Sequence, residues 1–162
     1  MQIAVLADTH LPRGSRRLPD RCLHLLSGSD LIVHAGDLTS RAFLAELRSL
    51  GPPVQVVAGN ADEAALLGEL PESLLFEANG VVVGVVHEPG PRAGREERLL
   101  RRFPECVVVV YGHTHLPQTT RHGGVWILNP GSPTERRRSE SRSMLLVEVS
   151  PGGELRPNLV LL

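Results

Sequence analysis

The stretch that decides the fold is VVVVYGHTH, residues 107–115, in which an apolar run ends in two histidines separated by one residue. Four consecutive valines suit neither an exposed strand nor a helix, so they predict a strand buried on both faces of a largely parallel sheet. The strand is expected to end at Tyr111, because Gly112 permits a sharp departure from the sheet. His113 and His115 then lie beyond its carboxyl end, where open α/β sheets bind their ligands.

Earlier apolar runs are also followed directly by residues that can bind a metal ion. These residues are Asp8 and His10 after 2–7, Asp37 after 30–35, Asn60 after 54–58 and His87 after 81–86. Asp8 and His10 stand two positions apart, a spacing that lets both side chains converge on one ion. With His113 and His115, the set comprises two carboxylates, one amide oxygen and four imidazoles, each at the end of a predicted strand.

Seven ligands are too many for one closed tetrahedral site, but they suit two five- or six-coordinate ions that share a carboxylate. Two ions about 3.5–4 Å apart can bind opposite oxygens of a phosphate and generate hydroxide at neutral pH, as in phosphate ester hydrolysis. A mixed oxygen and nitrogen set without thiolate favours Mn²⁺, Fe, Zn²⁺ or Ni²⁺ over Mg²⁺ and Ca²⁺. We expect two divalent ions, with Mn²⁺ as the first candidate.

Three other histidines are not expected to be ligands. His34 lies inside the predicted strand 30–35, where a packed, hydrogen-bonded side chain is the ordinary outcome. His24 belongs to a predicted helix, and His122 to a hairpin turn remote from the strand ends.

The remaining elements alternate between helices and hairpins. Helices are predicted over 19–27, from a cap at Thr39 or Ser40 to Gly51, over 63–67 and over 92–102. Hairpins are predicted over 73–86 through Asn79-Gly80, over 118–128 and over 143–162.

Length and composition predict one soluble domain over residues 1–162. The chain is 41% hydrophobic with a formal net charge of −1, and no apolar run is long enough to span a membrane. Its first residues are typical of a strand and not of a signal peptide, which favours a cytoplasmic location. Cys22 and Cys106 stand alone beside apolar residues, so we expect buried thiols and no disulfide.

All 17 basic residues are arginine, and they are spread along the chain except for the run Arg136 to Arg138. General nucleic-acid binding requires a net basic surface, which this composition does not predict. The run 136–138 has two interpretations: a solvated charge run, or arginines that bind phosphate in a bidentate manner. Arg136 is our candidate from this run for substrate binding.

The ligand motifs, taken in order, resemble those of the calcineurin-like metallophosphoesterases. The matching motifs are Asp8-x-His10, Gly36-Asp37, Gly59-Asn60-x-Asp62, His87 and Gly112-His113-x-His115. Chain length and the 129–132 loop (NPGS) resemble the small bacterial and archaeal phosphodiesterase branch of that family. The resemblance covers nearly the whole chain, and five motifs in order at strand ends are far more specific than any one of them.

The resemblance implies an α/β fold with four layers, α/β/β/α, in which helices flank two mixed sheets and the metal site lies at strand ends. It implies that Asp37 bridges two metals. The first metal would be held by Asp8, His10, Asp37 and His115, and the second by Asp37, Asn60, His87 and His113. We expect catalytic roles for Asp37, Asn60 and His113, and substrate contacts from Asn60 and Arg136.

Two positions depart from the family pattern. Much of the family has histidine after the asparagine of the third motif, where it assists the leaving group, and the small branch often has cysteine; this chain has Ala61. The branch tends to carry a second histidine shortly after His87, and Glu88-Pro89 stands there instead. The first departure removes an obvious general acid, and the second predicts altered substrate handling on that side of the site.

Three classes of function stay open on these residues. The first is a metal-dependent phosphodiesterase or related phosphatase acting on a small phosphate ester. The second is a non-catalytic scaffold like the retromer subunit that resembles the same branch, and the third is a module that binds metal or nucleotide without turnover. The scaffold subunit has lost ligands, whereas all seven positions here keep ligand types, so the first class is favoured. The oligomeric state is open, a homo-oligomer included.

Overall fold

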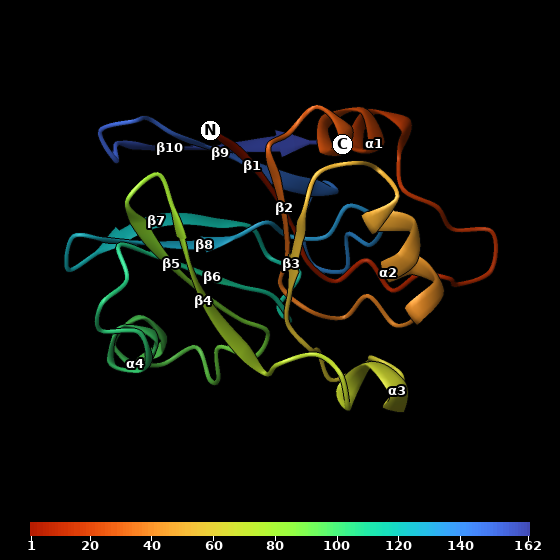
Figure 1. The fold of residues 1–162 in the computed structure, drawn as a ribbon. Helices are drawn as coiled ribbons and strands as arrows, with labels where there is room; N and C mark the ends of the chain where they lie inside the picture. The colour runs from red at the N-terminus through yellow and green to blue at the C-terminus, as the bar shows by residue number, and fades with distance from the viewer.

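The computed structural model describes residues 1–162 and contains two five-stranded sheets that face each other (Figure 1). The first sheet has the order β10-β9-β1-β2-β3 and the second the order β4-β5-β6-β8-β7. The first comprises β1 (Gln2–Leu6), β2 (Leu31–His34), β3 (Val54–Val56), β9 (Ser143–Val149) and β10 (Leu155–Leu161). The second comprises β4 (Ser73–Ala78), β5 (Val81–Val86), β6 (Val108–Tyr111), β7 (Gln118–His122) and β8 (Val125–Asn129).

Helices cover the outer faces of both sheets, so the predicted four-layer α/β/β/α sandwich is confirmed (Figure 1). They are α1 (Asp20–Ser27), α2 (Arg41–Arg48), α3 (Ala64–Leu67) and α4 (Arg95–Arg102). The first two pack on the first sheet and α4 on the second. None of the four has the length and apolarity that a bilayer span requires.

Alternation along the strands divides the core into layers. In β1, Ile3 and Val5 point between the sheets, whereas Ala4 and Leu6 point toward α1 and α2. Both faces of the strand are therefore apolar, as parallel strands in covered sheets require.

The valine run forms β6, which pairs in parallel with β5 on one side and β8 on the other. Val108 and Val110 enter the core between the sheets, and Val109 and Tyr111 pack under α4. The predicted strand is therefore buried on both faces, with one correction. Val107 precedes β6 and is 44% exposed, because it lies at the rim of the sheet where the chain arrives from α4.

Most predicted boundaries agree with the structure within three residues. The 73–86 hairpin matches β4 and β5, and Ser40, not Thr39, caps α2 by accepting a hydrogen bond from the Phe43 N–H. Helix α4 begins at Arg95 and not at residue 92, because Gly94 adopts a left-handed conformation with φ of 65°.

Strand direction explains where the ligand residues gather. Strands β1, β2 and β3 are mutually parallel in the first sheet, as are β5, β6 and β8 in the second. The loops that follow parallel strands leave from the same edge of a sheet, where open α/β sheets bind ligands.

Candidate metal centre

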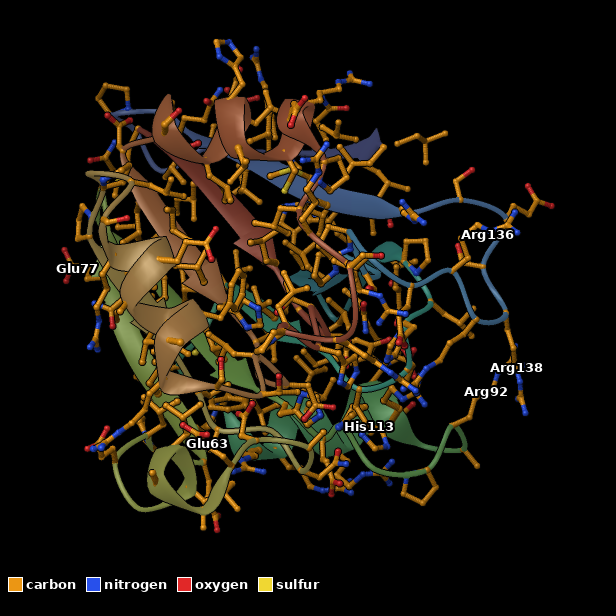
Figure 2. The ribbon with its side chains drawn as sticks, turned by 90° about the vertical axis from the view of Figure 1, so that its right-hand side faces the viewer. Glu63, Glu77, Arg92, His113, Arg136 and Arg138 are labelled. Carbon is orange, nitrogen blue, oxygen red and sulfur yellow. The ribbon has the colours of Figure 1, made fainter.

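The loops after β1, β2, β3, β5 and β6 bring the seven predicted ligands together. They are Asp8 and His10 after β1, Asp37 after β2, Asn60 after β3, His87 after β5, and His113 and His115 after β6. Five of them are buried, while Asn60 and His113 are exposed, and Figure 2 labels His113 within this group of loops. Both sheets contribute, so the cluster forms only when the sandwich is assembled.

Asp8, His10 and His115 form the first close group. The Nε2 atoms of His10 and His115 are 3.3 Å apart, and the His115 Nε2 lies 3.4 Å from the Asp8 Oδ1. Three donor atoms therefore point into one small space.

The second group surrounds the side-chain oxygen of Asn60. The Asn60 Oδ1 lies 3.1 Å from the His87 Nε2 and 2.9 Å from the His113 Nδ1. The His87 Nε2 is also 3.4 Å from the Asp37 Oδ1. Because the His87 Nδ1 is 2.8 Å from the Ala35 carbonyl, which only accepts, Nδ1 carries a proton and Nε2 is the ring atom that faces the cluster.

Asp37 lies between the two groups. Its Oδ2 is 3.6 Å from the His10 Nε2, and its Oδ1 faces His87. Asp8 also approaches both groups, since its carboxylate lies close to His10 and His115 and also to Asp37 and His87. The geometry thus gives Asp37 one oxygen toward each group, and it places Asp8 beside it.

Backbone strain is concentrated at these ligands. Eight non-glycine residues have positive φ, and five of them are predicted ligands: Asp8, His10, Asp37, His113 and His115. Such conformations are costly for residues with a Cβ and persist only where the surrounding structure imposes them. The surrounding fold therefore imposes the backbone conformations at five of the seven predicted ligands.

The electrostatics of the cluster favour binding of a cation. Burial raises the pKa of Asp8 to about 7, and the nearby Asp37 carboxylate adds to the rise. Burial acts to raise the pKa of Asp37 too, but its contact with His87 and the charge of that imidazole outweigh it and hold the pKa at about 2. Burial lowers the pKa of His115 to about 4, which leaves a neutral imidazole able to bind metal.

Unsatisfied polar atoms show that this donor set fits divalent ions. The Asp8 Oδ2 is buried without a hydrogen-bond partner, and the two Nε2 atoms of the first group face each other. Buried polar groups are normally paired, so a lone carboxylate oxygen beside converging imidazoles is most simply satisfied by a cation. The residues present are therefore suited to hold divalent metal.

The 129–132 loop supports the ligand loops from behind. The Ser132 hydroxyl donates to the Asp8 carbonyl oxygen at 2.7 Å, and the Asn129 amide donates to the Gly112 carbonyl oxygen at 3.1 Å. Both side chains are buried. The loop is therefore a turn that braces the ligand loops after β1 and β6.

Asp62 and Glu135 also contact the ligand loops, although the sequence did not predict this role for either residue. The Asp62 carboxylate accepts from the backbone N–H groups of Thr39 and Gly59, each at 2.7 Å, and so ties together the loops after β2 and β3. The Glu135 Oε2 lies 3.8 Å from the His115 Nδ1. Sequence analysis missed Glu135 because no strand end precedes it and its partners are distant in the chain.

Arg136 is not among the ligand loops. Its guanidinium donates to the Glu140 carbonyl oxygen at 3.4 Å, and it lines an open hollow that also contains Glu135. The structure therefore places it beside the metal cluster, not within it.

The histidines excluded by sequence lie outside the cluster. His34 is buried in β2 with its Nε2 3.0 Å from the Thr9 hydroxyl, His24 lies in α1, and His122 ends β7 with Glu97 nearby. We expect alanine at each position to leave metal content unchanged, as measured by elemental analysis. His34→Ala alone should lower stability, because it leaves a cavity behind Thr9. Metal loss in His24→Ala or His122→Ala would contradict the ligand set.

Gly59 is required by close approach of the Asp37 loop. A Cβ at residue 59 would lie 2.1 Å from the Asp37 backbone nitrogen and 2.2 Å from its Oδ1. We expect Gly59→Ala to displace Asp37, to lower metal content and to destabilise the fold by about 1–3 kcal/mol. Thermal unfolding and elemental analysis measure both effects. Gly68→Ala is the matched control, since its Cβ would meet nothing closer than 3.7 Å; an equal loss there would show that the close approach is not the cause.

Known proteins resemble this chain over most of its length. The sequence profile of the calcineurin-like phosphoesterase superfamily domain matches residues 1–152. A probable metallophosphoesterase of Methanothermobacter thermautotrophicus is 38% identical over 148 residues, covering 90% of this chain and 85% of that protein. Another from Methanocaldococcus jannaschii is 37% identical over 140 residues, covering 85% and 70%.

Solved structures share the fold over almost the whole chain. The solution structure of a Thermotoga maritima protein is 32% identical with a TM-score of 0.78, covering 99% of both chains. A variant of Vps29 from Entamoeba histolytica is 26% identical with a TM-score of 0.79, covering 100% of this chain and 99% of that one. Sequence profile, relatives and fold agree, and the chain belongs to the calcineurin-like phosphoesterase superfamily.

Proposed function

We propose that this protein is a metal-dependent phosphodiesterase that uses two divalent ions to hydrolyse a small phosphate ester. The observation that carries the proposal is the convergence of seven oxygen and nitrogen donors in two groups with Asp37 between them. Asp8, His10, Asp37 and His115 would hold one ion, and Asp37, Asn60, His87 and His113 the other. The mixed donor set favours Mn²⁺, Fe, Zn²⁺ or Ni²⁺ over Mg²⁺ and Ca²⁺, and Mn²⁺ is the first candidate.

Divalent ions held by these residues would supply Lewis acidity toward the phosphate and lower the pKa of a bound water. The protein residues hold the ions and the substrate in place. Asp37 and Asp8 provide the negative charge that holds cations in a largely buried site, and the Ala61 N–H fixes the Asp37 Oδ1 at 2.7 Å. Asn60 and His113 occupy the exposed side, so they are the ligands that an arriving phosphate meets first.

A pocket of about 370 Å³ opens beside Asn60 and His87. Its lining mixes charge and apolar surface, with Glu72, Glu88 and Arg102 as charged members and Leu67 among the apolar ones. One ester arm of a bound phosphodiester has room there. We assign the pocket to the leaving group, because its lining includes Asn60, one of the two exposed ligands.

The test is a panel of substrates on metal-stripped protein to which single ions are returned. Phosphomonoesters, phosphodiesters and cyclic nucleotides are each assayed with Mn²⁺, Zn²⁺, Ni²⁺ and Fe²⁺. We expect activity to depend on added ion and to be highest for phosphodiesters with Mn²⁺. Turnover that persists after stripping, or its absence with every ion although ions bind, would contradict the proposal.

A non-catalytic scaffold on the same fold is the second candidate. It is favoured by the likeness to Vps29 over the whole chain. The substrate panel separates the two, since a scaffold binds ions without turnover. We also propose a cytoplasmic location, supported by two free, buried cysteines, which are typical of a reducing compartment.

A further inference from the structure

An open hollow rich in arginine lies beside the metal cluster, on the side of His115. It is lined by Arg13, Arg16, Thr134, Glu135, Arg136 and Arg137, with no apolar residue. The loop after β1 and the segment after β8 supply these residues, so they meet only in the folded chain. Figure 2 shows Arg136 at the outer edge of the molecule, well apart from Arg138.

Glu135 holds this arginine hollow together. Its side chain is 9% exposed and accepts from Arg13 Nη1 and Arg137 Nε, each at 3.0 Å, and also from Arg16. Four guanidinium groups against one carboxylate leave an excess of three positive charges. Each guanidinium has five N–H donors, and the contacts with Glu135 use few of them, so donors remain for an anion.

The hollow adjoins the metal ligands directly. The Glu135 Oε2 is 3.8 Å from the His115 Nδ1, and the Thr134 hydroxyl donates to the Thr9 carbonyl oxygen at 2.7 Å. The hollow therefore lies next to a predicted metal ligand, so its guanidinium groups can reach a group carried by a phosphate ester bound at the cluster.

We propose that the arginine hollow binds a second phosphate of the substrate, carried on the ester arm that does not leave. This inference rests on the proposed phosphoesterase function. A phosphodiester at the metal cluster has two arms, and the cluster has two flanks. The mixed pocket beside Asn60 suits the leaving group, and the hollow suits a dianionic group, because arginine binds phosphate in a bidentate manner. The substrate class is thus a phosphodiester with one phosphorylated arm.

Two p-nitrophenyl phosphodiesters test the substrate class, one with a propyl arm and one with a 3-phosphopropyl arm. Both release the same leaving group, so they differ only in the second phosphate. We expect wild-type protein to show a lower KM for the 3-phosphopropyl ester. The double variant Arg13→Ala/Arg136→Ala should raise that KM about tenfold, leave kcat within about twofold and raise the KM of the propyl ester far less. Arg138→Ala, which removes a neighbouring charge outside the hollow, should behave as wild type.

A binding measurement without metal gives an independent readout. We expect titration of metal-free protein with inorganic phosphate to shift the backbone amide resonances of residues 134–137 saturably. The double variant should lose this response and Arg138→Ala should keep it. A linear, non-saturating shift, or equal responses in all three proteins, would mean an adventitious ion only and would overturn the proposed site.

The two proposals fail in different ways. Hydrolysis of both esters with equal KM, unchanged in the double variant, would overturn the arginine hollow as a substrate site and leave the phosphodiesterase proposal standing. Hydrolysis of neither ester with any ion would contradict the phosphodiesterase proposal, and the substrate inference would fall with it. The phosphate titration would still decide whether the hollow binds an anion.

Discussion

Replacing Asp37 by asparagine is expected to remove more bound metal than any other single substitution in the cluster. Its two carboxylate oxygens face different groups, Oδ2 toward His10 and Oδ1 toward His87. Asparagine keeps the shape but removes the charge, and its NH₂ group would confront one of the imidazole nitrogens. Because both ions would share this carboxylate, one substitution weakens both sites, whereas loss of a terminal ligand weakens one.

Elemental analysis after dialysis measures the effect, with about two ions per chain expected in wild type and fewer than one in Asp37→Asn. Asp8→Asn is the sharp comparison, because Asp8 also approaches both groups. We expect Asp8→Asn to retain more metal than Asp37→Asn, and His24→Ala to retain all of it. Two ions still bound in Asp37→Asn, or a larger loss in Asp8→Asn, would reject Asp37 as the bridge.

Hydrolysis is expected to depend steeply on the pKa of the leaving alcohol. A general acid is typically worth about 10²–10⁴ in rate, and the position that holds histidine in much of the family is Ala61 here. Asp62 cannot readily replace it, because both carboxylate oxygens accept backbone N–H groups. Activated aryl phosphodiesters should therefore be hydrolysed readily and alkyl esters poorly.

Ala61→His tests the cause. Residue 61 is exposed, so an imidazole there has room, and its backbone N–H can keep its bond to Asp37. We expect this variant to flatten the plot of log kcat against leaving-group pKa, with the largest gain for alkyl esters. A flat wild-type plot, with chemistry shown to be rate-limiting, would mean that another acid acts. Glu88 would then be tested by Glu88→Gln, since its exposed carboxylate lies 3.9 Å from the His113 Nδ1.

Local sequence patterns sufficed for the strands that carry the ligands. The apolar run before each ligand predicts a buried parallel strand, and polar residues directly after it must lie at the edge of a sheet, because alternation and burial leave them no other place. The valine run illustrates this, since Val108 to Tyr111 form a central strand buried on both sides. Its one error, Val107, arose because a single residue at a sheet rim carries no mark of exposure in the sequence.

The local apolar pattern could not predict that the strands form two sheets that pack against each other. Apolar strands of this kind are equally compatible with one open sheet, and the division into two sheets was expected from the family resemblance, not from the residues. The structure shows why the division matters to the site. Asp8 and Asp37 follow strands of the first sheet, and His87 and His115 follow strands of the second, so their mutual distances depend on how the sheets pack.

The sequence by itself determined the identity of the ligand-type residues and the strand ends on which they stand, because both follow from short-range burial and spacing. Only the tertiary structure decided which donors face one another, including the two oxygens of Asp37 that face different groups. It also decided that Arg13 and Arg16 contact Glu135, which lies more than a hundred residues later in the chain. Such contacts depend on side-chain direction and sheet packing over long separations, and a local apolar pattern carries no information about either.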